Sequence, residues 1–134
     1  MAADFAALEA RVDAAVAEGA DPEATLQRVC ALLSEGVPHY NWVGFYLVWP
    51  EEPGMLRLGP YVGAPTDHTR IPFGRGVCGQ VAESEETLVV PDVAAEGNYL
   101  ACSLDVRAEV VVPVFRDERF IGQLDSDSHV ADPC

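Results

Sequence analysis

Apolar residues in the first 36 positions recur at steps of three and four, the spacing of one face of an amphipathic helix. The first stripe consists of Phe5, Leu8, Val12 and Val16. The second stripe consists of Leu26, Val29, Cys30 and Leu33. Gly19 separates the stripes, and Asp21 followed by Pro22 is typical of a helix N-cap and first helical residue. The pattern predicts two helices within residues 1–36, with Cys30 as a small core residue.

From Asn41 onward the chain is rich in aromatic and β-branched residues, which are typical of strands. Strands are predicted at residues 42–49, 55–62, 88–90, 106–115 and 119–124. The polar pair Asp117-Glu118 indicates a hairpin turn between the last two strands. The glycine- and proline-rich residues 63–79 predict a loop that enters a short helix near Val77, and residues 91–105 are predicted to be irregular.

This order of elements predicts an α+β fold, a single antiparallel sheet with helices on one face. The 134 residues suit one domain, with its helices in residues 1–36 and its sheet and active-site loops in residues 41–128. Loop segments as long as the one in the middle of this chain are usually functional in small domains.

Composition narrows the classes of function. The hydrophobic fraction of 49% is sufficient for a core, so the chain is globular. The net charge of −14 argues against nucleic acid and anionic membrane surfaces as partners, because both require basic patches. The sequence contains neither a long apolar run nor the features of a signal peptide, so we expect a cytoplasmic protein. Four cysteines in that compartment suggest catalysis, metal binding or core filling.

Two of the cysteines stand in unusual surroundings. Cys78 lies between small residues in Gly76-Val77-Cys78-Gly79, at the predicted start of a helix, where the helix dipole stabilises a thiolate. Cys102 follows Ala101 in the irregular segment. Either cysteine alone is explained as an incidental small residue. Together they suggest a dithiol pair that the fold, rather than a CxxC spacing, must bring together.

Three acidic residues are further candidates. Glu109 opens an otherwise apolar strand, where it is either an ordinary solvent-facing residue or a buried functional one. Asp125 and Asp127 stand two residues apart at a strand end, so their side chains share one face. Such a pair either binds a cation or raises the pKa of one member and makes it a usable acid. The segment lacks the glycine and distant glutamate of a calcium-binding EF-hand loop.

Trp42 and Tyr46 are four residues apart on the first predicted strand and therefore share a face. They are either core aromatics or the walls of a pocket for an apolar or cationic group.

These residues lie within motifs that resemble a known family. The motifs are “NWVGFYL”, “TRIPFGRGVCG”, “PDV”, “AC”, “AEVVVPVF” and “IGQLDSDS”. They are similar, in order and spacing, to those of the free methionine-(R)-sulfoxide reductases, which are single GAF-domain enzymes. The resemblance covers residues 41–128 and implies an antiparallel sheet flanked by helices, with loops over a small pocket.

The resemblance also implies roles for the candidate residues. Cys102 matches the catalytic cysteine and Cys78 a partner thiol, while the acidic cluster at the substrate matches Glu109, Asp125 and Asp127. The aromatic pocket residues match Trp42 and Tyr46. The implied reaction reduces free methionine-(R)-sulfoxide through a cysteine sulfenic acid and a disulfide, with no bound cofactor or metal. Thioredoxin is the implied external reductant.

Two departures from the family pattern affect these expectations. A further family cysteine, commonly the resolving one, is replaced by His68, which either lowers the pKa of a nearby thiol or is a plain loop histidine. Resolution then falls to Cys78, to an external thiol or to the tail residue Cys134. The family's C-terminal helix is missing after residue 128, which leads us to expect a homodimer formed through the N-terminal helices.

Two other functions fit part of the pattern. A GAF module that senses a small ligand without turnover has the same fold. A metal site built from Cys102, His68 and the carboxylates is the other alternative. A sensor has no need for Cys102 together with Glu109 and both aspartates, so the sequence favours the enzyme.

Overall fold

The computed structural model describes residues 5–19, 21–90 and 107–128. The helices are α1 (Phe5–Glu18), α2 (Pro22–Gly36) and α3 (Gly76–Ser84). The strands are β1 (Trp42–Val48), β2 (Met55–Val62), β3 (Arg70–Pro72), β4 (Leu88–Val90), β5 (Ala108–Arg116) and β6 (Arg119–Ser128). All six strands form one sheet in the order β3-β2-β1-β6-β5-β4, and every neighbouring pair is antiparallel. The predicted α+β class is therefore confirmed.

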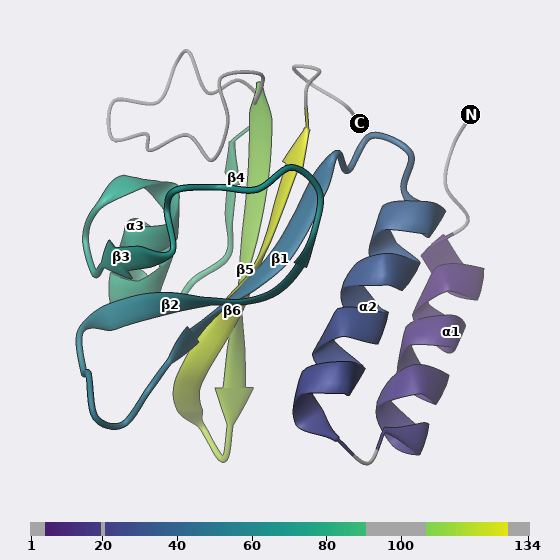
Figure 1. Cartoon of the computed structure of the whole chain (residues 1–134), viewed down its shortest axis with the longest axis horizontal. Helices are drawn as coiled ribbons and strands as arrows, with labels where there is room; N and C mark the ends of the chain where they lie inside the picture. The colour runs from purple at the N-terminus through teal and green to yellow at the C-terminus, as the bar shows by residue number, and fades with distance from the viewer. Residues whose placement is uncertain (1–4, 20, 91–106, 129–134) are drawn as a thin grey trace.

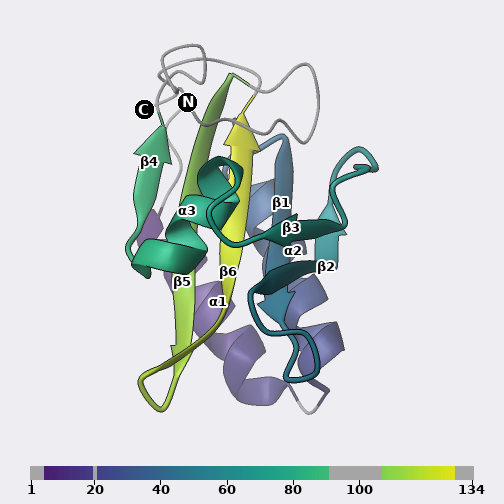
Figure 2. The same ribbon diagram turned by 90° about the vertical axis from the view of Figure 1, so that its left-hand side faces the viewer.

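Helices cover both faces of the sheet rather than one face as predicted. α1 and α2 pack on one side, and α3 lies on the other side beside the edge strand β3 (Figure 1, Figure 2). The alternation along β1 explains why both faces need cover. Val43 and Phe45 pack against the Cys30 side of α2, whereas Trp42 and Tyr46 pack in the cluster that contains α3.

The predicted features of α2 are confirmed. Asp21 accepts a hydrogen bond from the backbone N–H of Ala24 at 3.3 Å, and Pro22 occupies the first turn. Cys30 is fully buried, and burial raises the pKa of its thiol to about 12. Cys30 is therefore an inert core residue. In α1, by contrast, Val16 of the predicted apolar stripe is 55% exposed.

The last hairpin turns at Asp117 and Glu118, as predicted, and both residues adopt positive φ values of 52° and 66°. This left-handed pair is typical of the type I′ turn, whose twist matches that of the flanking strands.

One strand end was predicted wrongly, and one short strand was not predicted. β6 continues to Ser128, beyond the predicted end at residue 124. The polar residues after Leu124 remain in the strand because β1 and β5 pair with them on both sides. The short strand β3 lies in a segment predicted to be a loop.

A close approach of α3 to β3 explains one glycine of the “GVCG” motif. A Cβ at Gly79 would lie 2.8 Å from the carbonyl oxygen of Pro72 and 2.9 Å from the backbone of Gly74. Any side chain at this position would push α3 away from β3. In the described residues no helix has the length and apolar character needed to cross a membrane.

Candidate active site

Three carboxyl groups meet at the centre of the sheet, on the face that α3 covers. Asp127 of β6 pairs with Glu109 of β5 and with Trp42 of β1, while Asp125 pairs with Gly44 and Val111. The three acidic side chains are at most 2% exposed. The predicted shared face of Asp125 and Asp127 is confirmed, and the solvent-facing alternative for Glu109 is wrong.

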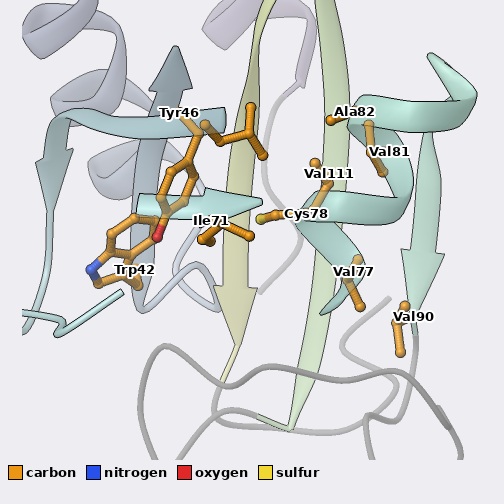
Figure 3. Packing of buried hydrophobic residues seen from close by; sticks show 10 residues of the cluster. Trp42, Tyr46, Ile71, Val77, Cys78, Val81, Ala82, Val90 and Val111 are labelled. Atoms are coloured by element: carbon orange, nitrogen blue, oxygen red, sulfur yellow. The ribbon is translucent and has the colours of Figure 1, made fainter. Parts of the chain in front are cut away.

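Cys78 reaches the same carboxyl groups from α3. Its Sγ lies 3.5 Å from Oδ2 of Asp125 and 3.8 Å from Oε2 of Glu109. The residue is 5% exposed and lies between Ile71 and Val111 in the core (Figure 3). The predicted position of Cys78 at the start of a helix is confirmed, and α3 buries the residue in the core. Its contacts are those of a thiol that donates to carboxyl oxygens, so they favour the neutral thiol over the thiolate.

The surroundings keep protons on this cluster. Burial, followed by the negative charge of Asp127, raises the pKa of Glu109 to about 8. Burial, followed by the charge of Glu109, raises the pKa of Asp125 well above its usual value. At neutral pH the cluster therefore holds at least one protonated carboxyl group, which is a proton donor beside a thiol.

The raised pKa values predict that the free energy of unfolding falls as the pH rises. Between about pH 4.5 and 8 the folded protein retains a proton on Glu109 that the unfolded chain releases. The contribution from this group is complete below pH 4.5 and is lost at about 1.4 kcal/mol per pH unit through the window. We expect urea unfolding at pH 5, 6, 7 and 8 to show this fall in the wild type and a flatter profile in Glu109→Gln.

The matched control for that measurement is Glu118→Gln, which makes the same change at the exposed hairpin turn. It should retain the wild-type slope. A Glu109→Gln profile as steep as that of the wild type would show that Glu109 is ionised in the folded protein.

The aromatic pair lies beside the acid cluster. The rings of Trp42 and Tyr46 stack with their centroids 6.3 Å apart, and Tyr61 stacks on Trp42 at 5.4 Å. The predicted shared face is confirmed, and both residues belong to the core cluster of Cys78 (Figure 3). Sequence reasoning missed Tyr61. This residue pairs with Gly44 of β1, and the absence of a side chain at Gly44 leaves space for the Trp42 ring.

Both aromatic residues use their polar atoms to hold the segment that follows β2. Trp42 Nε1 donates to the carbonyl of Ala64 at 3.0 Å, and the Tyr46 hydroxyl donates to the carbonyl of His68 at 2.9 Å. Trp42 is 4% exposed and Tyr46 is fully buried, so both side chains are core aromatics in this structure, the first of the two predicted alternatives.

Tyr46→Phe is expected to lower the free energy of unfolding by about 1 kcal/mol, because the carbonyl of His68 loses its donor. Urea denaturation measures this loss. Tyr61→Phe removes a hydroxyl from the neighbouring ring and is expected to have a smaller effect. Equal losses in the two variants would contradict a specific role for the Tyr46 hydroxyl.

The predicted metal alternative gains no support from His68. Among the described residues, the cluster of potential donors consists of Cys78, Glu109 and Asp125, whose ligand atoms lie within 4.8 Å of one another, and His68 is not part of it. Its two carboxyl groups have raised pKa values, and a protonated carboxyl group is a poor cation ligand.

Cys102 and Cys134 lie outside the described residues. The described chain stops before Cys102 at Val90 and resumes after it at Arg107. Val90 pairs with Glu109, so the chain enters the segment that contains Cys102 beside the acid cluster.

Gln123 is a site residue that sequence reasoning missed. It is fully buried on β6, and its Nε2 donates to the carbonyl oxygen of Cys78 at 2.9 Å. A signal existed in the sequence, because Gln123 is a polar residue two positions before Asp125 and therefore shares its face.

Comparison with known proteins identifies the family of the chain. The GAF domain family matches residues 21–133. Protein YtsP of Bacillus subtilis is 38% identical over 127 residues, which are 95% of this chain and 77% of YtsP. The free methionine-R-sulfoxide reductase of Escherichia coli is 39% identical over 107 residues, or 80% of this chain. The chain spans 62% of the length of that enzyme, less than two thirds.

A solved structure agrees over the whole fold. The free methionine-R-sulfoxide reductase of Neisseria meningitidis, in complex with its substrate, is 43% identical with a TM-score of 0.89. The match covers 98% of this chain and 80% of that chain. The resemblance found in the sequence motifs is thus confirmed, and the chain belongs to the GAF-domain family of free methionine-R-sulfoxide reductases.

Proposed function

We propose that this protein reduces free methionine-(R)-sulfoxide to methionine with thiols as the source of electrons. The observation that carries the proposal is the buried pair of proton-holding carboxyl groups, Glu109 and Asp125, beside a thiol and an aromatic wall. A sulfoxide is reduced by a thiol only when its oxygen is protonated or strongly hydrogen-bonded, and a carboxyl group that stays neutral at pH 7 supplies that proton.

In the proposed reaction the thiolate of Cys102 attacks the substrate sulfur while a proton passes from Glu109 to the sulfoxide oxygen. The sulfur–oxygen bond of the substrate breaks, the oxygen passes to Cys102 as a sulfenic acid, and methionine leaves with its sulfur reduced by two electrons. A second thiol then attacks the sulfenic sulfur, forms a disulfide and releases the oxygen as water. A dithiol such as thioredoxin reduces the disulfide and restores Cys102.

The second thiol of this cycle is Cys78, the tail residue Cys134 or an external thiol. Cys78 must leave its contacts with Asp125 and Glu109 and move out of the core before it can react. An external dithiol faces no such requirement. The proposal includes a cytoplasmic location, where thioredoxin keeps thiols reduced, and a homodimer.

The test is turnover of the two epimers of free methionine sulfoxide, with dithiothreitol or thioredoxin as the reductant and methionine release as the readout. We expect turnover of the R epimer alone. Binding of either epimer without thiol consumption would overturn the proposal in favour of the sensor. Equal turnover of both epimers would also contradict it.

A further inference from the structure

We propose that Gln123 is a positioning residue that fixes the Cys78 thiol against the Asp125–Glu109 carboxyl pair. The inference rests on the proposed reductase function and adds to it a residue that lies within the “IGQLDSDS” motif but received no role from the resemblance. Gln123 connects the sheet to α3 across 45 positions of sequence, through a hydrogen bond of 2.9 Å from Nε2 to the carbonyl oxygen of Cys78.

The position of Gln123 in the sheet makes this connection specific. Gln123 pairs with Tyr46 on β1 and precedes Asp125 by two residues on the same face of β6. One strand therefore contributes both contacts to Cys78: Gln123 holds its backbone carbonyl, and Asp125 accepts from its thiol at 3.5 Å. The two contacts hold Cys78 at its main chain and at its side chain. Because both partners belong to β6, this strand fixes the distance between the Cys78 thiol and the carboxyl group of Asp125.

The energetics of the amide favour a positioning role over plain packing. Gln123 is fully buried, and its Oε1 has no hydrogen-bond partner among the residues that the structure describes. A buried acceptor without a partner costs about 1–3 kcal/mol, and an apolar side chain of the same length would avoid that cost. Packing of α3 does not require the amide, because Val77 and Val81 already fix the helix in the core. The amide is explained by its hydrogen bond to the carbonyl oxygen of Cys78, the one that it makes within the described part of the chain.

Gln123→Met tests the inference, because methionine keeps the length and volume of the side chain but has no donor for the Cys78 carbonyl. The matched control is Leu124→Val, a change at the next residue of β6 on the opposite face. The Cys78 thiol orients the carboxyl groups of Asp125 and Glu109, to which it donates. With free methionine-(R)-sulfoxide we therefore expect Gln123→Met to lower kcat about tenfold and to change KM less than twofold, since a misplaced proton donor impairs the chemical step. The control should retain at least half of the wild-type kcat at an equal or larger loss of thermal stability.

A second readout does not depend on turnover. The rate at which iodoacetamide modifies Cys78 in the native protein, followed by peptide mass spectrometry, should rise about tenfold in Gln123→Met and less than twofold in Leu124→Val. Equal kcat losses or equal labelling rates in the two variants would overturn the positioning role and reduce Gln123 to a packing residue. If the wild type lacks reductase activity, the proposed function fails, and the labelling rates alone decide whether Gln123 positions Cys78.

Discussion

Glu109→Gln is expected to lower kcat/KM for free methionine-(R)-sulfoxide by about 10² to 10⁴, the usual contribution of a general acid. Glutamine has the shape of a protonated glutamic acid and donates a hydrogen bond, but it cannot transfer a proton to the sulfoxide oxygen. The measurement is the initial rate of methionine release at pH 7 with dithiothreitol in excess.

The pH dependence separates loss of the acid from loss of structure. In the wild type, kcat/KM should fall as the pH rises through about 8, because Glu109 then loses the proton that it must donate. Glu109→Gln should lack this alkaline limb, whereas Glu118→Gln should retain both the limb and the wild-type rate. Wild-type kcat/KM in Glu109→Gln would mean that Asp125, whose pKa is also raised, donates the proton. Asp125→Asn would then lose the activity.

Much of the fold could be predicted because every strand except the three-residue β3 shows a local pattern of apolar and β-branched residues in the sequence. The alternation along β1 determines which residues face α2 and which face α3. The Asp117-Glu118 turn sets the register of the last hairpin only as far as Phe115, because an irregularity between Val114 and Phe115 shifts the pairing beyond it. The end of β6 could not be predicted, because its run of buried polar residues has the composition that is typical of a loop. Their strand conformation depends on pairing with β1 and β5, which a local pattern does not contain.

The acid cluster was also within reach of sequence reasoning, since a spacing of two on a strand is enough to place Asp125 and Asp127 on one face. The surroundings of Cys78 were not. The sequence placed Cys78 at the start of a helix but did not show that this helix is buried. The burial follows from the close contact of α3, at Gly79, with the backbone of Pro72 and Gly74. The same tertiary contact buries the thiol and places it beside Asp125. Spacing gives the face of a side chain, but only the packing of α3 on the sheet gives the partner of Cys78.

Cys102→Ser is expected to reduce methionine release by at least about 10³-fold, the largest loss among the cysteine variants. A serine hydroxyl remains protonated at neutral pH, so it is a weak nucleophile toward the sulfoxide sulfur, and it cannot form the sulfenic acid that takes up the oxygen. The measurement is release of methionine from the free R epimer, in single turnover without reductant and in steady state with thioredoxin.

The other cysteines supply the controls that assign roles within this reaction. Cys30→Ala removes a thiol whose pKa of about 12 and full burial make it unreactive, so it should retain wild-type rates. Cys78→Ser should still release one equivalent of methionine per chain, and dimedone should trap the sulfenic acid on Cys102, if Cys102 is the nucleophile. Loss of the first equivalent in Cys78→Ser, together with its retention in Cys102→Ser, would reverse the two roles. Because the contacts of Cys78 are those of a neutral thiol between two carboxyl groups, we expect the first equivalent to depend on Cys102.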